Sequence, residues 1–388
     1  MWPGAPSMAT TKVGTASRES SIDFARGAAM LCVFFAHFSE EPWVPTSNGV
    51  LLWLHRMGMI ASPTFVLVSG LTLAFVLGRT RAEALPHRKL LVLDRALFML
   101  VVVHAILVCS DVLLAPRNRD FRQFFITDLV ALNLMLGVIL LPPTSNLIRL
   151  TLGACFYVLG WAIHLHWHPV TAQLALAQEI LTGPSTSHAL EFGFPVLQWA
   201  GVFLLGTVLG EGFLAARTKV AREGWAVRLI VRGVACSVLA LGLKALALTP
   251  WPQQFIATHP GTAEAFSLFG KLPPSPLYLL FFGGLGACII GLSTLISLYG
   301  AIPRAVEWVT VLGRNSLCAF LLQSVVFRDA VARLRLANDP WTWPFIFAAA
   351  TFVIWMGAHA WDRMAGNRWL TLGIGRGWGE GVEGRARG

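Results

Sequence analysis

The chain has 388 residues, of which 55% are hydrophobic and only 13% are charged, and its mean hydropathy is +0.64. This composition excludes an ordinary soluble domain and predicts an all-α integral membrane protein. The net charge of +10 does not indicate a nucleic-acid-binding protein, because the Lys and Arg residues are spread between apolar segments rather than gathered on one domain.

Ten apolar segments are candidates to span a bilayer core, which takes about 20 residues of helix. Their approximate bounds are 24–41, 48–78, 90–114, 124–141, 147–166, 192–211, 226–248, 277–299, 306–327 and 342–361. If the N-terminus is cytoplasmic, most Lys and Arg residues fall on the cytoplasmic side, so the positive-inside rule places both termini there. We therefore predict a multi-pass protein of the cell (plasma or inner) membrane, with a flexible segment 1–17, a bundle over 18–365 and a disordered Gly/Arg-rich tail over 366–388.

The first predicted span carries ionisable side chains on one face. Arg26 and His37 are eleven residues apart, which returns to within about 20° of the same face, about 16 Å further along the helix. Asp23 precedes Arg26 by three residues, so its carboxylate is expected to pair with the guanidinium. Because ionisable groups are costly at membrane depth, this stripe indicates an internal cavity. The alternative is that Arg26 anchors the inner interface and His37 the outer one.

Further polar positions follow along the chain. The connection after the second span contains Arg79, Arg81, Arg88 and Lys89, which either guide an anionic nucleotide or only set the topology. We expect His104, Asp128 and Asn133 to form a structural polar cluster between the third and fourth spans. The outer connections 167–191 and 249–275 are long enough to act as lids or to form interfacial helices that cap the bundle.

Metal binding is not predicted. The six cysteines all lie in predicted spans without CxxC spacing, so we interpret them as small buried apolar residues. His164, His166 and His168 alternate at a helix end, which spreads their rings, and no Asp, Glu or Cys nearby completes a ligand set. Interfacial histidines are the favoured interpretation.

Four short stretches resemble signatures of one superfamily. The first reads R-x3-ID-xx-RG-x9-H and consists of Arg18, Ile22, Asp23, Arg26, Gly27 and His37. In the second span, ASPTFVLVSGLTLAF resembles a pattern of a small residue with Pro, aromatic residues and a Ser-Gly pair at Ser69. KLPPSPLYLL, which begins at Lys271, is similar to a segment that opens a late helix. LGRNSLCAFLLQ is similar to the next helix, in which Gln323 stands where a histidine is common.

On these residues, the chain resembles the transmembrane acyltransferase superfamily over about residues 18 to 362. The superfamily includes acyltransferase family three, glucan-modifying OpgC-type proteins and the heparan-alpha-glucosaminide N-acetyltransferases. The resemblance implies transfer of an acyl group from acyl-CoA, usually acetyl-CoA, to a hydroxyl or amine of a sugar or glycoconjugate. As the spacing of Cys and His and the spread of Lys and Arg indicate, we expect no metal and no nucleic-acid partner. The oligomeric state is left open, with a homodimer as one option.

The same resemblance suggests roles for individual residues. His37 is the catalytic candidate, since an imidazole titrates near neutrality and can take the acceptor's proton; a covalent acyl-histidine is the alternative route. Arg26, held by Asp23, suits a phosphate of CoA. Ser69 is expected to help position the donor, although a Ser-Gly pair also serves close helix packing.

The acceptor side is less determined. Lys271 and Ser275 are expected to contact the acceptor, or else to form only an interfacial edge. Asn315 and Gln323 are expected to line the cavity or to cross-link helices. Two other function classes stay open: a transporter or flippase of a sugar-linked or anionic substrate, which should show broken helices or inverted repeats, and a sensor or assembly protein that retains the fold without activity.

Overall fold

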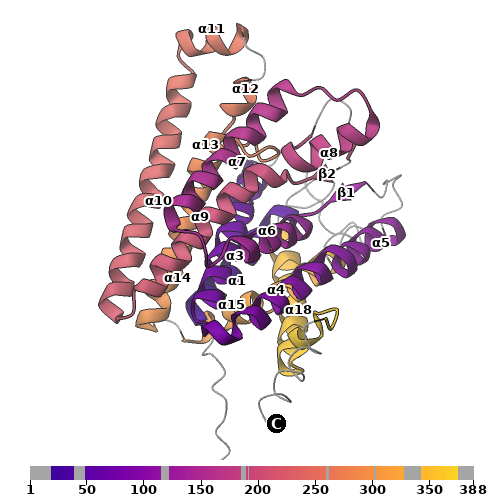
Figure 1. The fold of residues 1–388 in the computed structure, drawn as a ribbon, viewed down its shortest axis with the longest axis vertical. Helices are drawn as coiled ribbons and strands as arrows, with labels where there is room; N and C mark the ends of the chain where they lie inside the picture. The colour runs from indigo at the N-terminus through magenta and orange to yellow at the C-terminus, as the bar shows by residue number, and fades with distance from the viewer. Residues whose placement is uncertain are drawn as a thin grey trace, which may run out of the picture.

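The computed structural model describes residues 19–38, 49–114, 122–184, 189–190, 192–258, 262–300, 303–326 and 342–374. Almost all of these residues are helical (Figure 1), and eight segments among them are long and apolar enough to cross a membrane. The prediction of an all-α, multi-pass membrane protein is therefore confirmed. The segment 1–17 lies outside the described residues, and the side of the membrane that each terminus faces stays a prediction.

The eight segments are built from one or several elements each. Five of them are single helices: α1 (Ser20–Phe38), α7 (Asn146–His166), α9 (Val196–Ala215), α10 (Lys219–Ala247) and α18 (Trp343–Arg363). Two others combine α2 (Gly49–Gly58) with α3 (Ala61–Gly78), and α13 (Pro276–Tyr278) with a π-helical turn (Leu279–Gly283) and α14 (Gly284–Tyr299). The remaining one consists of a 3-10 turn (Ala82–Ala84), α4 (Leu85–Phe98), a π-helical turn (Met99–Val103) and α5 (His104–Leu114).

Two of the ten expected spans differ from the prediction. The fourth is the 15-residue helix α6 (Ile126–Leu140), which is shorter than a full span. The ninth is divided at Asn315 into α15 (Pro303–Arg314) and α16 (Ser316–Val325). The Asn315 side chain donates a hydrogen bond to the carbonyl of Val311 (3.0 Å), and such local bonds compete with the regular helical ladder.

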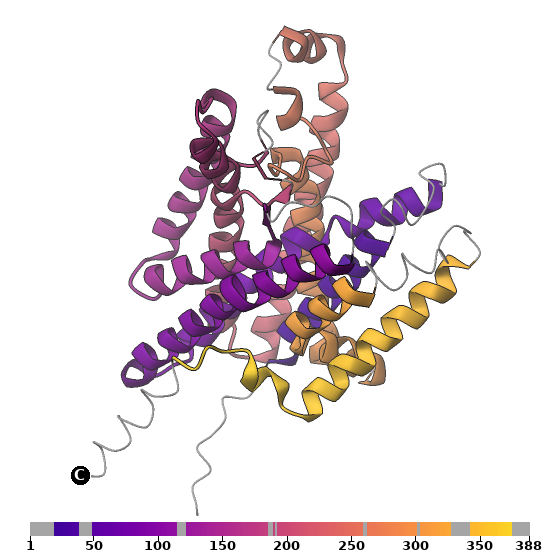
Figure 2. The same ribbon diagram turned by 90° about the vertical axis from the view of Figure 1, so that its right-hand side faces the viewer.

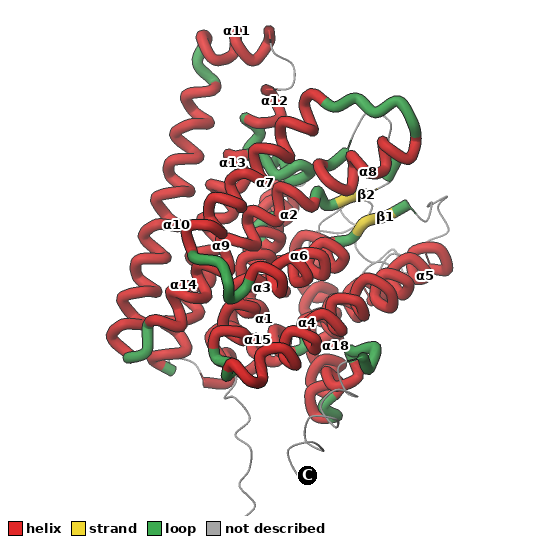
Figure 3. Tube along the Cα trace, viewed as in Figure 1, coloured by secondary structure: helices red, strands yellow, loops and turns green. Residues whose placement is uncertain are grey.

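The long outer connections form short helices and one small sheet. Residues 167–191 contain α8 (Ala172–Thr182), whereas 249–275 contain α11 (Pro250–Thr258) and α12 (Thr262–Ala265). Strands β1 (Gln123–Phe124) and β2 (Phe192–Gly193) pair in parallel, with Gln123 opposite Phe192 (Figure 3). These elements lie together at one end of the bundle, around the tops of α7 and α10 (Figure 1).

Glycines bring α1 and α15 into backbone contact. A Cβ added at Gly27 would overlap the carbonyl oxygen of Val309, and one added at Gly313 would overlap that of Asp23. Small residues allow transmembrane helices to approach this closely. The crossing places the end of α15 beside Asp23 and Arg26, the charged residues of α1.

The first residues of the predicted C-terminal tail contact the helical bundle. After α18, residues Gly366–Trp369 form a 3-10 turn, and Leu370 is buried. The main-chain N–H of Leu372 then donates a hydrogen bond to Asp94 of α4 (2.9 Å). In Figure 2 this yellow segment runs from the end of α18 across to the purple helices. Polar contacts therefore hold residues 366–374 of the predicted tail in place, and residues 375–388 are outside the described part.

Candidate functional site

A cavity of about 600 Å³ lies between α1, α3, α4, α6 and α16. Its size is within the range of small-molecule sites in proteins, about 300–1,000 Å³. The five helices come from distant parts of the sequence, so no single motif encloses the space. Residues of the C-terminal segment after α18 contribute to its wall through Asn367.

One end of the cavity is strongly basic. Its lining includes the arginines Arg26, Arg79, Arg88, Arg95 and Arg314. Only two carboxylates, those of Glu19 and Asp23, are among the lining residues. A guanidinium presents several N–H donors in a planar fork that matches phosphate and carboxylate oxygens. This end of the cavity is therefore suited to a ligand with more than one negative charge.

The opposite end is apolar. It is lined by Val33 of α1, Phe65 of α3, Met99 after α4, Val130 of α6 and Phe320 of α16. From Glu19 to Val33, α1 rises about 21 Å along the cavity wall. The lining thus changes from charged to apolar along the helix axis, as an amphipathic ligand requires.

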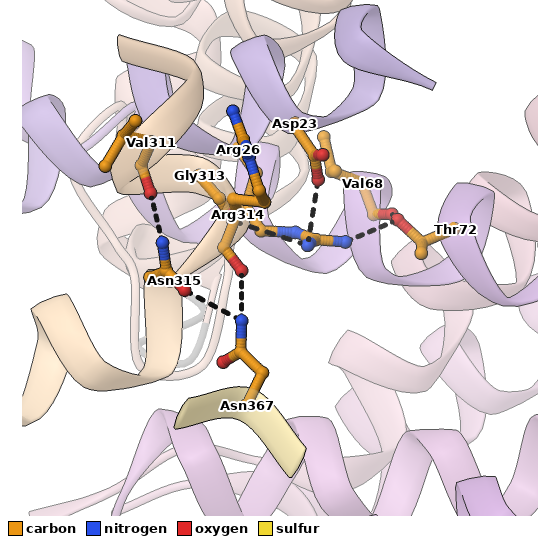
Figure 4. A network of polar contacts seen from close by, with 9 residues as sticks. All are labelled: Asp23, Arg26, Val68, Thr72, Val311, Gly313, Arg314, Asn315 and Asn367. Carbon is orange, nitrogen blue, oxygen red and sulfur yellow. Dashed lines mark hydrogen bonds and ion pairs between the residues drawn. The ribbon is translucent and has the colours of Figure 1, made fainter. Parts of the chain in front are cut away.

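Arg26 is held by contacts from three helices (Figure 4). One terminal nitrogen donates to Thr72 Oγ1 of α3 (2.9 Å), and the other donates to the carbonyl of Gly313 in α15 (3.4 Å). Asp23 lies 3.6 Å from the guanidinium and is itself buried, so the expected ion pair is present. The Arg26 side chain keeps 19% of its surface exposed, and this surface faces the cavity.

His37 lies on α1 one helical turn beyond Val33, and it is half-buried. The cavity lining includes Val33 but does not extend to His37. The two sequence candidates are therefore on one stripe of α1, with Arg26 inside the basic end and His37 just past the apolar end.

Residues 19–359 match the model of a protein family described as an acyltransferase domain. This match covers most of the chain. The chain belongs to acyltransferase family 3. The family is the one that the four sequence motifs resemble, and it makes the protein a membrane-embedded acyltransferase. No curated protein matches the chain.

The Ser-Gly pair of this acyltransferase serves two purposes. Gly70 packs against α9, where an added Cβ would overlap the carbonyl of Phe203. Ser69 faces the cavity, and its hydroxyl donates to the carbonyl of Phe65 one turn earlier (2.7 Å). The close-packing interpretation thus applies to Gly70, whereas the role of Ser69 in positioning the donor stays a prediction. Thr72, which orients Arg26, was not predicted from the sequence as a site residue, although its position three residues after Ser69 places it on the same face of α3.

The residues predicted for the acceptor lie away from the cavity. Lys271 Nζ lies 5.0 Å from the ring centroid of Phe194. Ser275 is fully buried; its oxygen accepts from the N–H of Tyr278, which caps α13, while its hydroxyl donates to the carbonyl of Ser267. These contacts give both residues structural functions, and their contact with an acceptor stays a prediction.

Asn315 and Gln323 are buried and do not line the cavity. Asn315 cross-links helices, because its Oδ1 accepts a hydrogen bond from Asn367 (2.7 Å). Gln323 donates to the neighbouring Ser324 hydroxyl (3.3 Å). The cavity lining in this region instead includes Arg314 and Ser316, directly before and after Asn315 in the motif, together with Leu317 and Phe320.

A second polar cluster lies between the third and fourth expected spans. His104 Nδ1 and Asp128 Oδ2 are 2.9 Å apart, and Asp128 also accepts from the N–H of Phe125 (2.8 Å). The predicted contact between His104 and Asp128 is therefore confirmed, whereas the buried side chain of Asn133 forms no hydrogen bond with either of them. Within the described ranges, no group of three or more His, Cys, Asp or Glu residues is placed to hold a metal ion.

Proposed function

We propose that this acyltransferase moves an acyl group, in the simplest case acetyl, from acyl-CoA on the cytoplasmic side to a hydroxyl or amine of a sugar or glycoconjugate at or beyond the membrane. The observation that carries the proposal is the gradient along α1. Five arginines surround one end of the cavity, and apolar walls lead from there to within one turn of His37. The proposed location is the plasma or inner membrane.

Coenzyme A has the chemistry that this gradient requires. Its phosphates are polyanionic and suit the arginine-lined end, where guanidinium groups form bidentate, charge-assisted hydrogen bonds. Its pantetheine arm is uncharged and extended, so it can follow the apolar walls. The rise of about 16 Å from Arg26 to His37 is the distance over which this arm would carry the thioester.

In the proposed reaction, the imidazole of His37 accepts the proton of the acceptor's O–H or N–H as the acceptor atom attacks the thioester carbonyl carbon. The new C–O or C–N bond forms, the C–S bond breaks, and the CoA thiolate leaves. The proton then passes from His37 to the sulfur, so no oxidant, reductant or metal is consumed. An acyl group carried briefly on His37 is the alternative sequence of the same bond changes.

The acceptor reaches His37 from the side opposite to the arginines. This follows from the position of His37 beyond the apolar end of the cavity, since the donor fills the path from the basic end. The sugar or glycoconjugate class rests on the resemblance of the first-span and late-helix motifs. Lys271 and Ser275, at the start of α13, remain the proposed contacts for it.

Binding and turnover of radiolabelled acetyl-CoA by the purified full chain in detergent test the proposal. Arg26→Gln should weaken binding, whereas His37→Gln should bind the donor but lose turnover. The matched controls are Arg228→Gln, an exposed arginine of α10, and His359→Gln, which stacks on Trp355 of α18 (5.1 Å); both should behave as wild type. Wild-type protein that binds neither acetyl-CoA nor longer acyl-CoAs would refute the proposed donor.

A further inference from the structure

The segment that follows α18 contributes Asn367 to the lining of the cavity. We name residues 364–374 the C-terminal strap. Asn367, which lines the cavity, donates from its side-chain nitrogen to the carbonyl of Arg314 (3.2 Å) and to Asn315 Oδ1 (2.7 Å). Figure 4 shows that these bonds join the strap to the break between α15 and α16, next to the residues that hold Arg26.

The strap has a second anchor on α4. Asp94 is 1% exposed, and its carboxylate accepts hydrogen bonds from the N–H of Leu372 (2.9 Å) and from the hydroxyl of Thr371. A buried carboxylate is costly unless donors satisfy it, and the strap supplies two of them. Asp94 directly precedes Arg95, one of the five cavity arginines.

Both the side chain and the main chain of Arg314 are held by residues at or after the end of α18. Its Nη1 lies 3.1 Å from Asp362 Oδ2 at the end of α18, while Asn367 holds its carbonyl. The family match ends at residue 359, so Asp362 and the entire strap lie beyond it. Arg314 is thus held by contacts that the matched region does not contain, and Arg95 directly follows Asp94, the residue of α4 that the strap contacts.

We propose that the strap is a part of the anion site, and that Asp94 and Asn367 are positioning residues that set its affinity for a diphosphate-bearing ligand. They act by holding Arg95 and Arg314 at the basic end of the cavity. This inference rests on the proposed function for the identity of the ligand as CoA, but the affinity for a simple diphosphate tests it separately.

The experiment compares the full chain with Asn367→Ala, Asp94→Asn and a deletion of 364–388. Dissociation constants are measured first for inorganic pyrophosphate and then for CoA. Loss of one or two hydrogen bonds that position a charged group should weaken both ligands about tenfold, and the deletion should weaken them further. In turnover assays, the point variants should raise KM for acyl-CoA and leave kcat near the wild-type value.

Two controls separate this role from a general loss of stability. A deletion of 375–388 keeps the strap and should bind as wild type. Asn146→Ala removes an amide that accepts from Arg149 (2.7 Å) away from the cavity, so it should lower the unfolding temperature without changing either dissociation constant.

Point variants that bind pyrophosphate and CoA within twofold of wild type would overturn the role of the strap and leave the proposed function standing. If wild type binds pyrophosphate but not CoA, the proposed function fails, and the pyrophosphate affinities of the variants decide for or against the strap. Wild-type protein that binds neither ligand would overturn both.

Discussion

Replacement of Thr72 by valine isolates the contact that orients Arg26. Valine has nearly the same shape but lacks the hydroxyl, which accepts from Arg26 (2.9 Å) and donates to the carbonyl of Val68 (2.6 Å). A hydrogen bond to a charged group contributes about 1.5–3 kcal/mol, and we take the lower end because the guanidinium is partly exposed. A loss of about 1.5 kcal/mol corresponds to about tenfold weaker donor binding. Titration calorimetry with CoA in detergent measures this change.

Thr294→Val is the matched control for this experiment. Like Thr72, Thr294 is a helical threonine whose hydroxyl donates to the carbonyl one turn earlier, that of Ile290 (3.0 Å), but it is buried and does not line the cavity. Both variants should change the unfolding temperature to a similar extent, while only Thr72→Val should weaken CoA binding. If Thr72→Val binds CoA as tightly as the control does, Thr72 does not set the orientation of Arg26 and the reasoning is refuted.

Two further predictions use residue pairs that differ in one property. Arg88→Gln should weaken CoA binding about tenfold, whereas Arg81→Gln should not, because of these two residues only Arg88 lines the cavity. A binding titration measures both variants. Equal effects of the two substitutions would mean that the basic connection acts through its net charge alone. Gly313→Ala should lower the unfolding temperature by several degrees, since its Cβ would overlap the carbonyl of Asp23, whereas Gly283→Ala has open space around it. Thermal unfolding checks this pair, and similar temperatures for the two variants would contradict the close helix crossing.

The sequence by itself determined the features that depend on residues near one another in the chain. Long apolar runs predicted the membrane helices, because a bilayer core requires backbone hydrogen bonds to be satisfied within each segment. Helical periodicity placed Asp23, Arg26 and His37 on one stripe of α1, since a spacing along one helix sets the direction of each side chain. The motifs also identified the family that the chain belongs to.

The break in the ninth span and the roles of its polar residues were not evident from periodicity. Asn315 looked like a position inside a continuous apolar helix, but its side chain competes for a backbone carbonyl and divides the helix. The sequence did not show that the Ser275 oxygen caps α13, and its predicted contact with the acceptor stays a prediction. In both cases the local structure depends on a side-chain hydrogen bond, and the pattern of apolar residues does not reveal such a bond.

Only the tertiary structure determines which residues form the basic end of the cavity. Arg26, Arg88 and Arg314 belong to different helices, and the spacing between them in the sequence carries no information about their distance in space. Their convergence depends on which helix faces pack together, as at the close crossing of α1 and α15. The strap is the clearest case, because its hydrogen bonds go to Asp94 and Asn315, which are far from it in the sequence.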